Sequence, residues 1–226
     1  MRDISATYSA VDQAGQVSKV LRNTYSLLAM TLLFSAVTAG IAMAVNMSHG
    51  MGMVCSLIAL GLVWLVLPRT ANSANGIWVV FAFTGLLGAA LGPILNRYLG
   101  MANGGTIVMQ ALGGTALVFF GLSAYVLTTR KDFSFMGGFL MVGLLVAVVA
   151  SLGALVAGLF GVEISTFSLA ISALVVLLMS GFILFDTSRI IHGGETNYIM
   201  ATVALYLDIY NLFTSLLHLL GALNDE

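Results

Sequence analysis

The chain has 226 residues, of which 60% are hydrophobic and only 8% are charged, and its formal net charge is −1. A soluble domain carries about 25% charged residues, so the composition indicates a polytopic membrane protein whose first partner is the lipid bilayer. The absence of excess positive charge gives no reason to expect nucleic acid as a partner. A single cysteine, Cys55, excludes an internal disulfide.

The first 22 residues form a polar segment before any apolar run. They contain several charges and lack the apolar core of a cleavable signal peptide. No strong helical stripe is present before residues 17–21, so we expect a partly flexible tail. The sequence therefore divides into an N-terminal tail, residues 1–22, and one membrane domain, residues 23–226.

Uncharged runs predict seven membrane-spanning helices. The run between Arg22 and Arg69 is too long for one helix of about 20 residues and divides at residues 46–50. Pro68 is expected to close the second span, and Pro93 to kink or end the third. Alternating strand patterns are absent, so the fold class is all-α. The predicted spans lie near residues 25–45, 51–67, 76–95, 104–128, 135–158, 165–188 and 198–221.

Small residues recur at spacings that let membrane helices approach closely. Such sites are Gly88 with Gly92, Gly153 with Ala157, and Gly113, Gly114 and Gly121 in the fourth span. The sequence predicts tight helix packing at these positions.

Positive charges orient the seven spans. With a cytoplasmic N-terminus, only Arg97 of the eight basic residues lies outside. Cytoplasmic segments of membrane proteins carry an excess of Lys and Arg, so this bias predicts an outside C-terminus. The basic residues of the inside segments are Arg2, Lys19, Arg22, Arg69, Arg130, Lys131 and Arg189.

An aspartate interrupts each of the last two spans. Asp186 lies near the end of the sixth and Asp208 well inside the seventh, with the turn at residues 192–196 about midway between them. In an antiparallel hairpin the two carboxyls would lie at similar depth and could face each other. A carboxylate at membrane depth costs roughly 2.5–3.5 kcal/mol on insertion scales, which favours a functional role over an accidental one. Such a pair would share a proton and act as a proton-sensitive latch or a cation site.

The last span carries a polar stripe. Asp208, Asn211, Ser215 and His218 are spaced three or four residues apart, which places them on one helical face. A polar stripe on an apolar helix faces a protein interior or a wet cavity, so the last helix is expected to be packed among the others. Asn211, Ser215 and His218 either bond to neighbouring helices or form a polar pathway.

The final hairpin resembles the Bax inhibitor-1 family of membrane proteins. The resemblance rests on ILFDTSRIIHGG, which contains Asp186, and VALYLDIYNLFTSLLHLLG, which contains Asp208. It implies six helices surrounding a central C-terminal helix. The bacterial branch is the nearest, because of GGETNYIMATVALYLDIYNLF, and it implies location in the bacterial inner membrane.

The resemblance also implies a function, a pH-sensitive calcium leak gated by Asp186 and Asp208. Calcium prefers oxygen ligands, so both carboxylates are candidate transient Ca²⁺ ligands, and no tightly bound cofactor is expected. Arg69 is the nearest match to an arginine that latches the closed state in relatives. The second span departs from those relatives, because residues 56–61 contain no acid.

Two other functions compete with the leak. The bacterial branch implies regulation of the membrane AAA protease FtsH without ion transport. The N-terminal tail would be the handle, that is, the segment through which the protease binds this chain. A metal-dependent hydrolase would need ligands that converge, but His49, His192 and His218 form no HxxxH or HExxH motif and are expected near different faces. We therefore expect no enzymatic activity. The sequence does not predict an oligomeric state.

Overall fold

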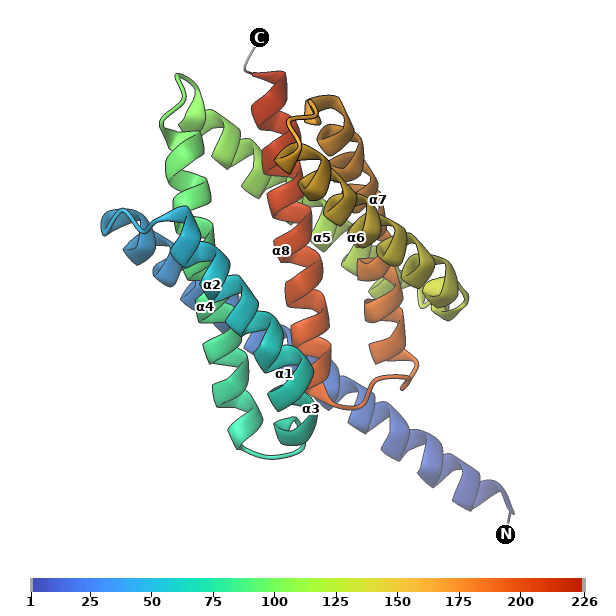
Figure 1. Cartoon of the computed structure of the whole chain (residues 1–226). Helices are drawn as coiled ribbons and strands as arrows, with labels where there is room; N and C mark the ends of the chain where they lie inside the picture. The colour runs from blue at the N-terminus through green and yellow to red at the C-terminus, as the bar shows by residue number, and fades with distance from the viewer. Residues whose placement is uncertain (1, 225–226) are drawn as a thin grey trace. The chain divides into compact units, whose positions relative to one another are not determined.

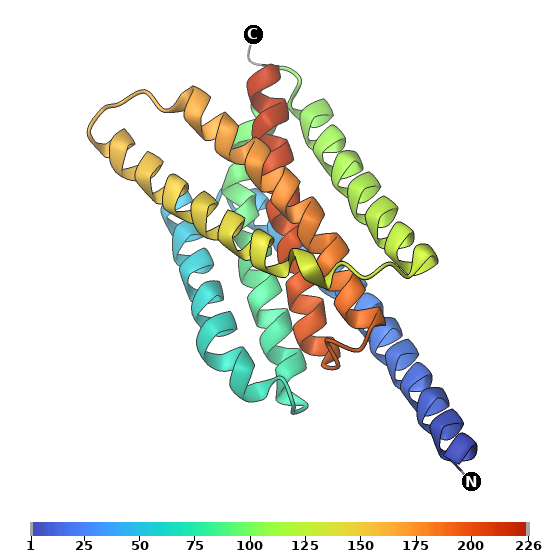
Figure 2. The same cartoon turned by 90° about the vertical axis from the view of Figure 1, so that its right-hand side faces the viewer.

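The computed structural model describes residues 2–224, with side chains from residue 15 onward, and these residues form helices joined by short connections (Figure 1, Figure 2). No strand occurs among the described residues. The elements are α1 (Arg2–Ala44), α2 (His49–Gly61), the π-helix η1 (Leu62–Val66), α3 (Leu67–Thr70), α4 (Asn75–Leu99), α5 (Gly104–Thr129), the 3₁₀-helix η2 (Ser134–Met136), α6 (Gly137–Leu159), α7 (Ser165–Ile191) and α8 (Tyr198–Leu223).

In the part of the chain that the structure describes, seven helical stretches are long and apolar enough to cross a membrane, which confirms the predicted all-α, seven-span class. The last span is strongly enclosed. Half of its most apolar window is buried, and only α4, with 56%, exceeds it; the other five reach 17–33%. This burial agrees with the expectation that the C-terminal helix is packed among others. The spans are Gly15–Ala44, His49–Thr70, Asn75–Leu99, Gly104–Thr129, Ser134–Leu159, Ser165–Ile191 and Tyr198–Leu223.

The backbone is helical from Arg2, so α1 begins within the tail that lacks a strong helical stripe, and the partial flexibility of that tail stays a prediction. The expectation for Pro68 was wrong. Pro68 does not close the second span, because it lies in the first turn of α3, where the lack of a backbone N–H is tolerated. The preceding π-turn, in which the Leu67 N–H donates to the Leu62 carbonyl, carries the helix into that proline.

The helices group into two compact units. The first comprises Met1–Gly100 and Ile190–Tyr206, and therefore contains α1 to α4 and the start of α8. Here α2 and α4 run side by side, and α1 packs against α4 (Figure 1). The break before α2 falls where predicted, with the Ser48 side chain accepting the Met51 N–H.

Glycines on α4 determine how closely α1 approaches. A Cβ at Gly88 would lie 2.3 Å from the Ser35 carbonyl oxygen, and one at Gly92 would lie 2.5 Å from the Ala42 side chain. Only glycine fits at these two positions, so the predicted Gly88–Gly92 packing site is confirmed.

The second unit comprises Met101–Arg189 and Leu207–Glu226, and so contains α5, α6, most of α7 and the rest of α8. In Figure 2, α6 and α7 run side by side. Glycines again mediate the contact, since a Cβ at Gly137 would meet the Phe185 ring and one at Gly181 would meet Leu140.

Three glycines predicted to mediate packing do not. A Cβ at Gly113, Gly121 or Gly153 would meet nothing within 4 Å. Spacing alone failed here because it does not report which face of a helix meets another helix.

Candidate functional site

The candidate site is a pair of buried carboxyls in the second unit. Asp186 on α7 is 8% exposed and Asp208 on α8 is 5% exposed. Their side chains are hydrogen-bonded to each other. A carboxylate only accepts hydrogen bonds, so this bond requires a proton on one of the two groups. The structure thus brings together the two aspartates that the sequence singled out.

One oxygen of the pair has unused bonding capacity. Asp208 Oδ2 is buried and has no hydrogen-bond partner among the described residues. A buried acceptor left without a partner costs about 1–3 kcal/mol. That cost is relieved when a water, a proton or a cation binds the oxygen, so the pair has the chemistry of a small-ion or proton site.

A cation adjoins the pair from its own helix. Arg189 lies three residues after Asp186, and its Nη1 is 3.6 Å from Asp186 Oδ1. The guanidinium also lies over the Phe185 ring, 5.5 Å from the centroid, and is partly exposed. Arg189 therefore offsets negative charge on Asp186 at the end of α7.

The two residues between Asp186 and Arg189 bind other elements. Thr187 and Ser188 are fully buried. The Thr187 hydroxyl lies 3.5 Å from that of Ser123 on α5. Ser188 Oγ accepts the Phe133 N–H at 2.9 Å, which ties α7 to the connection between α5 and η2. Successive residues of a helix point about 100° apart, so four neighbours can reach four different directions.

The polar stripe of α8 is mostly enclosed. Ser215 is buried, and Asn211 and His218 are half-buried. His218 Nδ1 lies 2.8 Å from the Ser172 hydroxyl of α7, whereas the Asn211 amide donates to the Leu207 carbonyl of its own helix. The interior orientation of the stripe agrees with the prediction, and its role as a pathway stays a prediction.

Arg69 lies exposed at the end of the second span, in the first unit. Its guanidinium donates to the Leu65 carbonyl one turn earlier. Its proposed role as a latch stays a prediction.

The first unit contains a polar node that the sequence analysis missed. Tyr206 is fully buried, and its hydroxyl lies 2.7 Å from that of Ser35 on α1 and 3.3 Å from the Thr84 carbonyl on α4. Its ring packs edge-on against the Phe83 ring, with the two ring centroids 5.5 Å apart. The node fixes the first part of α8 against two other helices.

Asn197 fixes the start of α8. Its Oδ1 accepts the N–H groups of Ile199 and Met200, and its amide donates to the Ala71 carbonyl and to Asn72. The cap thus links the α7–α8 turn to the α3–α4 connection. An asparagine directly before an apolar run signals a helix start, so this feature was readable from the sequence.

No group of three or more His, Cys, Asp or Glu side chains able to hold a metal occurs among the residues that the structure describes.

A model of the family described as inhibitor of apoptosis-promoting Bax1 matches residues 17–225. The chain belongs to the Bax inhibitor-1 family. Among its relatives, the Escherichia coli K12 protein named modulator of FtsH protease YccA is 56% identical over 204 residues, 90% of each chain. A Vibrio cholerae protein, named only as an uncharacterized membrane protein, is 50% identical over 219 residues, 96% of each chain.

More distant relatives of this Bax inhibitor-1 chain also match along nearly the whole length. A Campylobacter jejuni protein is 35% identical over 219 residues, 95% of this chain and 93% of its own. The match therefore includes both units and the aspartate hairpin, and the predicted family is confirmed.

Proposed function

We propose that this chain modulates a membrane-bound AAA protease of the FtsH type. The observation that carries the proposal is its 56% identity, over 90% of both chains, to the Escherichia coli protein named as a modulator of that protease. A second relative, from another Escherichia coli strain, is named an inner membrane protein. We place this chain in the same bacterial inner membrane, with a cytoplasmic N-terminus as the positive charges favour.

The segment before the first span is the proposed handle. It is the tail of residues 1–22, which ends at Arg22 before the first long uncharged run. The proposed topology places this tail on the cytoplasmic side of the membrane.

Deletion of residues 2–20 tests the handle. The full chain should co-purify with the protease from bacterial membranes and should slow degradation of a second membrane substrate. The deletion variant should lose both effects. Asp208→Asn is the matched control and should keep them, because it leaves the N-terminal segment intact. Retained binding by the deletion variant would contradict the handle.

A second candidate function is a proton-controlled cation leak through the second unit. It is favoured by the buried Asp186–Asp208 bond and by the unpartnered Asp208 Oδ2. With the shared proton, the carboxyls bind each other. Without it, two adjacent carboxylates repel and offer oxygens to Ca²⁺. Asn211, Ser215 and His218 would continue the polar path, and Arg69 would latch the closed state.

Calcium flux into liposomes containing the purified protein, between pH 6 and 8, tests the leak. Flux should rise with pH in the wild type and lose that dependence in Asp208→Asn. Arg69→Gln should raise flux at low pH if Arg69 latches the closed state. Flux no higher than in empty liposomes, from protein shown to be folded, would exclude the leak and leave the pair as a structural clasp.

A further inference from the structure

The connection between α5 and η2 has a fixed shape. Arg130 ends α5 in the left-handed region with φ 51°, and Asp132 Oδ1 accepts the Ser134 N–H at 2.8 Å. Ser188 holds the Phe133 N–H from α7. Three local constraints within a few residues leave this connection little freedom, so the side chains that it presents are positioned in advance.

Lys131 is the cation that this connection holds in place. Its Nζ donates to the Tyr125 hydroxyl at 3.0 Å and lies 5.6 Å from the centre of that ring. The hydrogen bond to Tyr125 raises the pKa of Lys131 above its ordinary value, so the ammonium stays charged. An ammonium has three donors, and Tyr125 takes one of them. The others are available to an anion at the surface.

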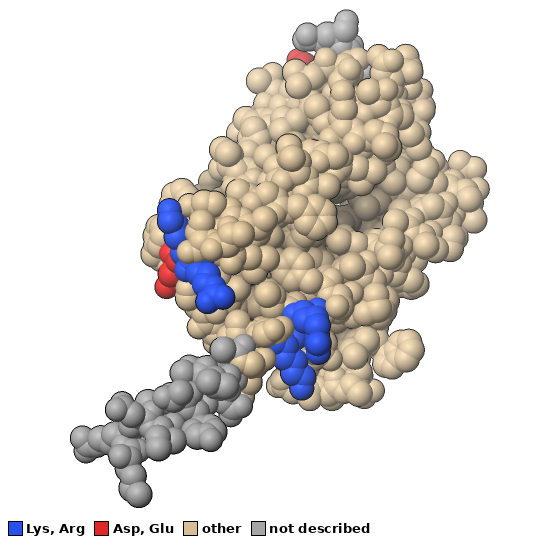
Figure 3. Space-filling model, turned by 180° about the vertical axis from the view of Figure 1, so that it is seen from behind, with Lys and Arg blue, Asp and Glu red and all other residues tan. Residues whose placement is uncertain are grey.

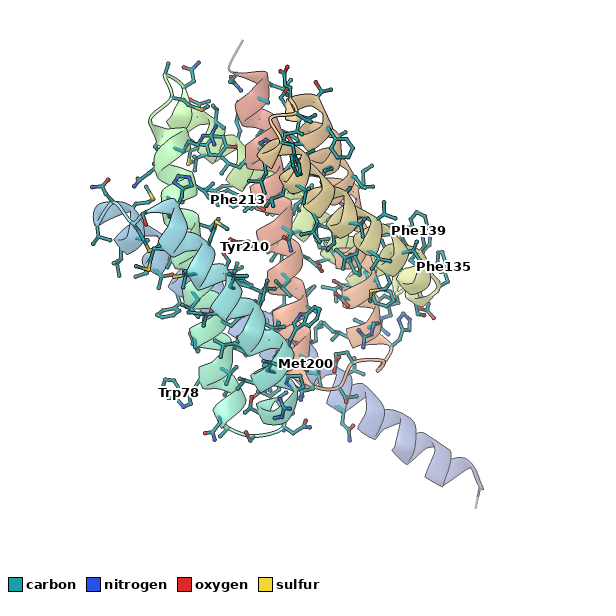
Figure 4. The ribbon with its side chains drawn as sticks, viewed as in Figure 1. Trp78, Phe135, Phe139, Met200, Tyr210 and Phe213 are labelled. Atoms are coloured by element: carbon teal, nitrogen blue, oxygen red, sulfur yellow. The ribbon has the colours of Figure 1, made fainter. Side chains whose placement is uncertain are left out.

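Two large aromatic rings follow this cation in the sequence, at the start of the fifth span. Phe135 is 80% exposed and Phe139 is 74% exposed, and their spacing of four residues places them on one side. Figure 4 shows both rings pointing away from the helices. The ring centroids of Tyr125 and Phe133 lie 6.2 Å apart, and those of Phe133 and Phe135 lie 6.4 Å apart. A row of rings therefore leads from Lys131 to the exposed pair.

We propose that Lys131, Tyr125, Phe135 and Phe139 form a binding site for an anionic phospholipid of the phosphatidylglycerol class. The Lys131 ammonium binds the headgroup phosphate. Phe135 and Phe139 contact the glycerol backbone and the upper acyl chains, where aromatic rings of membrane proteins are enriched.

A lipid fits this surface better than a soluble anion. A soluble phosphate would contact only the cation, whereas one phospholipid would contact both the cation and the exposed rings. Charged side chains are confined to small patches on the face in Figure 3, with uncharged surface around them. The proposal depends neither on protease modulation nor on ion flux.

A single-tryptophan variant tests the site in nanodiscs. Trp64→Phe and Trp78→Phe remove the native tryptophans, both highly exposed, and Phe135→Trp places a reporter in the site. Quenching by brominated phosphatidylglycerol is compared with quenching by brominated phosphatidylcholine. One cation near a membrane surface contributes about fivefold to the preference for anionic lipid, so we expect that ratio in the parent.

Lys131→Gln in the reporter background should reduce the ratio to about one. Tyr125→Phe, which keeps the ring and removes the anchoring hydroxyl, should reduce it partly. Arg97→Gln is the matched control, since it removes one exposed positive charge elsewhere and should leave the ratio unchanged. A parent ratio of one, or an equal loss in Arg97→Gln, would overturn the site and indicate only general attraction by net charge.

Discussion

Tyr206 and Asp208 lie two residues apart on α8, and both are buried polar side chains that bond to other helices, yet they do so in different ways. Tyr206 belongs to the first unit and bonds to Ser35 and to the Thr84 carbonyl. Asp208 belongs to the second unit and bonds to Asp186. The first contact joins neutral groups, and the second joins two acids.

The difference assigns different roles to the two parts of α8. Tyrosine and serine hydroxyls keep their protons throughout the physiological pH range, so the Tyr206 node is independent of pH. The carboxyl pair needs a proton to hold together, so the attachment of Asp208 to α7 is conditional. A structural response of this protein to pH should therefore arise in the second unit, while the first unit stays unchanged.

The largest expected effect comes from removing the neutral node. Tyr206→Ala deletes a fully buried aromatic side chain and should lower the free energy of unfolding by about 3–5 kcal/mol, measured by SDS titration in mixed micelles. Tyr206→Phe keeps the ring and loses the hydroxyl, which should cost about 0.6 kcal/mol, a typical value for hydrogen bonds between membrane helices. Both losses should be equal at pH 6 and pH 8. A loss that changes with pH would contradict the division between the two parts of α8.

Gly88→Ala disturbs the same node from its α1 side. The new Cβ would meet the Ser35 backbone, so α1 must move, and overpacking of this kind costs up to about 3 kcal/mol. Gly113→Ala is the control, because its Cβ meets open space and alanine favours a helix by about 1 kcal/mol over glycine. The same titration should show destabilisation in the first variant and none in the second. A neutral Gly88→Ala would mean that α1 and α4 are less closely packed than the structure has them.

Asp208→Asn examines the conditional contact. In the wild type the shared proton is present at low pH, so stability is highest there and falls as rising pH removes the proton. We expect a loss of about 2 kcal/mol between pH 6 and pH 8, since a buried charged group without its partner costs at least that much. Asparagine keeps the shape and a donor without titrating, so the variant should show a flat profile. A wild-type profile that is already flat would show that the folded pair binds no more protons than the unfolded chain over this range, so that the shared proton is absent.

The sequence predicted the spans, the meeting of Asp186 with Asp208 and the Gly88–Gly92 contact, because each depends on composition or on spacing along a helix. Other features depend on which faces of the helices meet, which spacing does not report. Gly113 and Gly153 therefore did not show the expected packing. The Tyr206 node was not predicted, because tyrosine is common in apolar helices and its presence alone does not indicate a polar contact. Arg189 was used only for topology, although its spacing of three from Asp186 was visible.

Ser188 provides the smallest and most local test, because it acts on the pair only through the backbone of α7. Its hydroxyl accepts the Phe133 N–H, and it lies two residues after Asp186. Ser188→Ala leaves that N–H without a partner and should cost about 1 kcal/mol. Hydrogen exchange of residues 131–136 should become faster, and the pH profile of unfolding should broaden because Asp186 is held less firmly.

Ser180→Ala is the matched control on the same helix. The Ser180 hydroxyl donates only to the Val176 carbonyl of α7, so its loss should leave both the exchange rates and the pH profile unchanged. Faster exchange without any change in the pH profile would mean that the connection and the carboxyl pair are independent. A change in both would show that the connection between α5 and η2 supports Asp186, and that the conditional half of α8 depends on a contact made outside the hairpin.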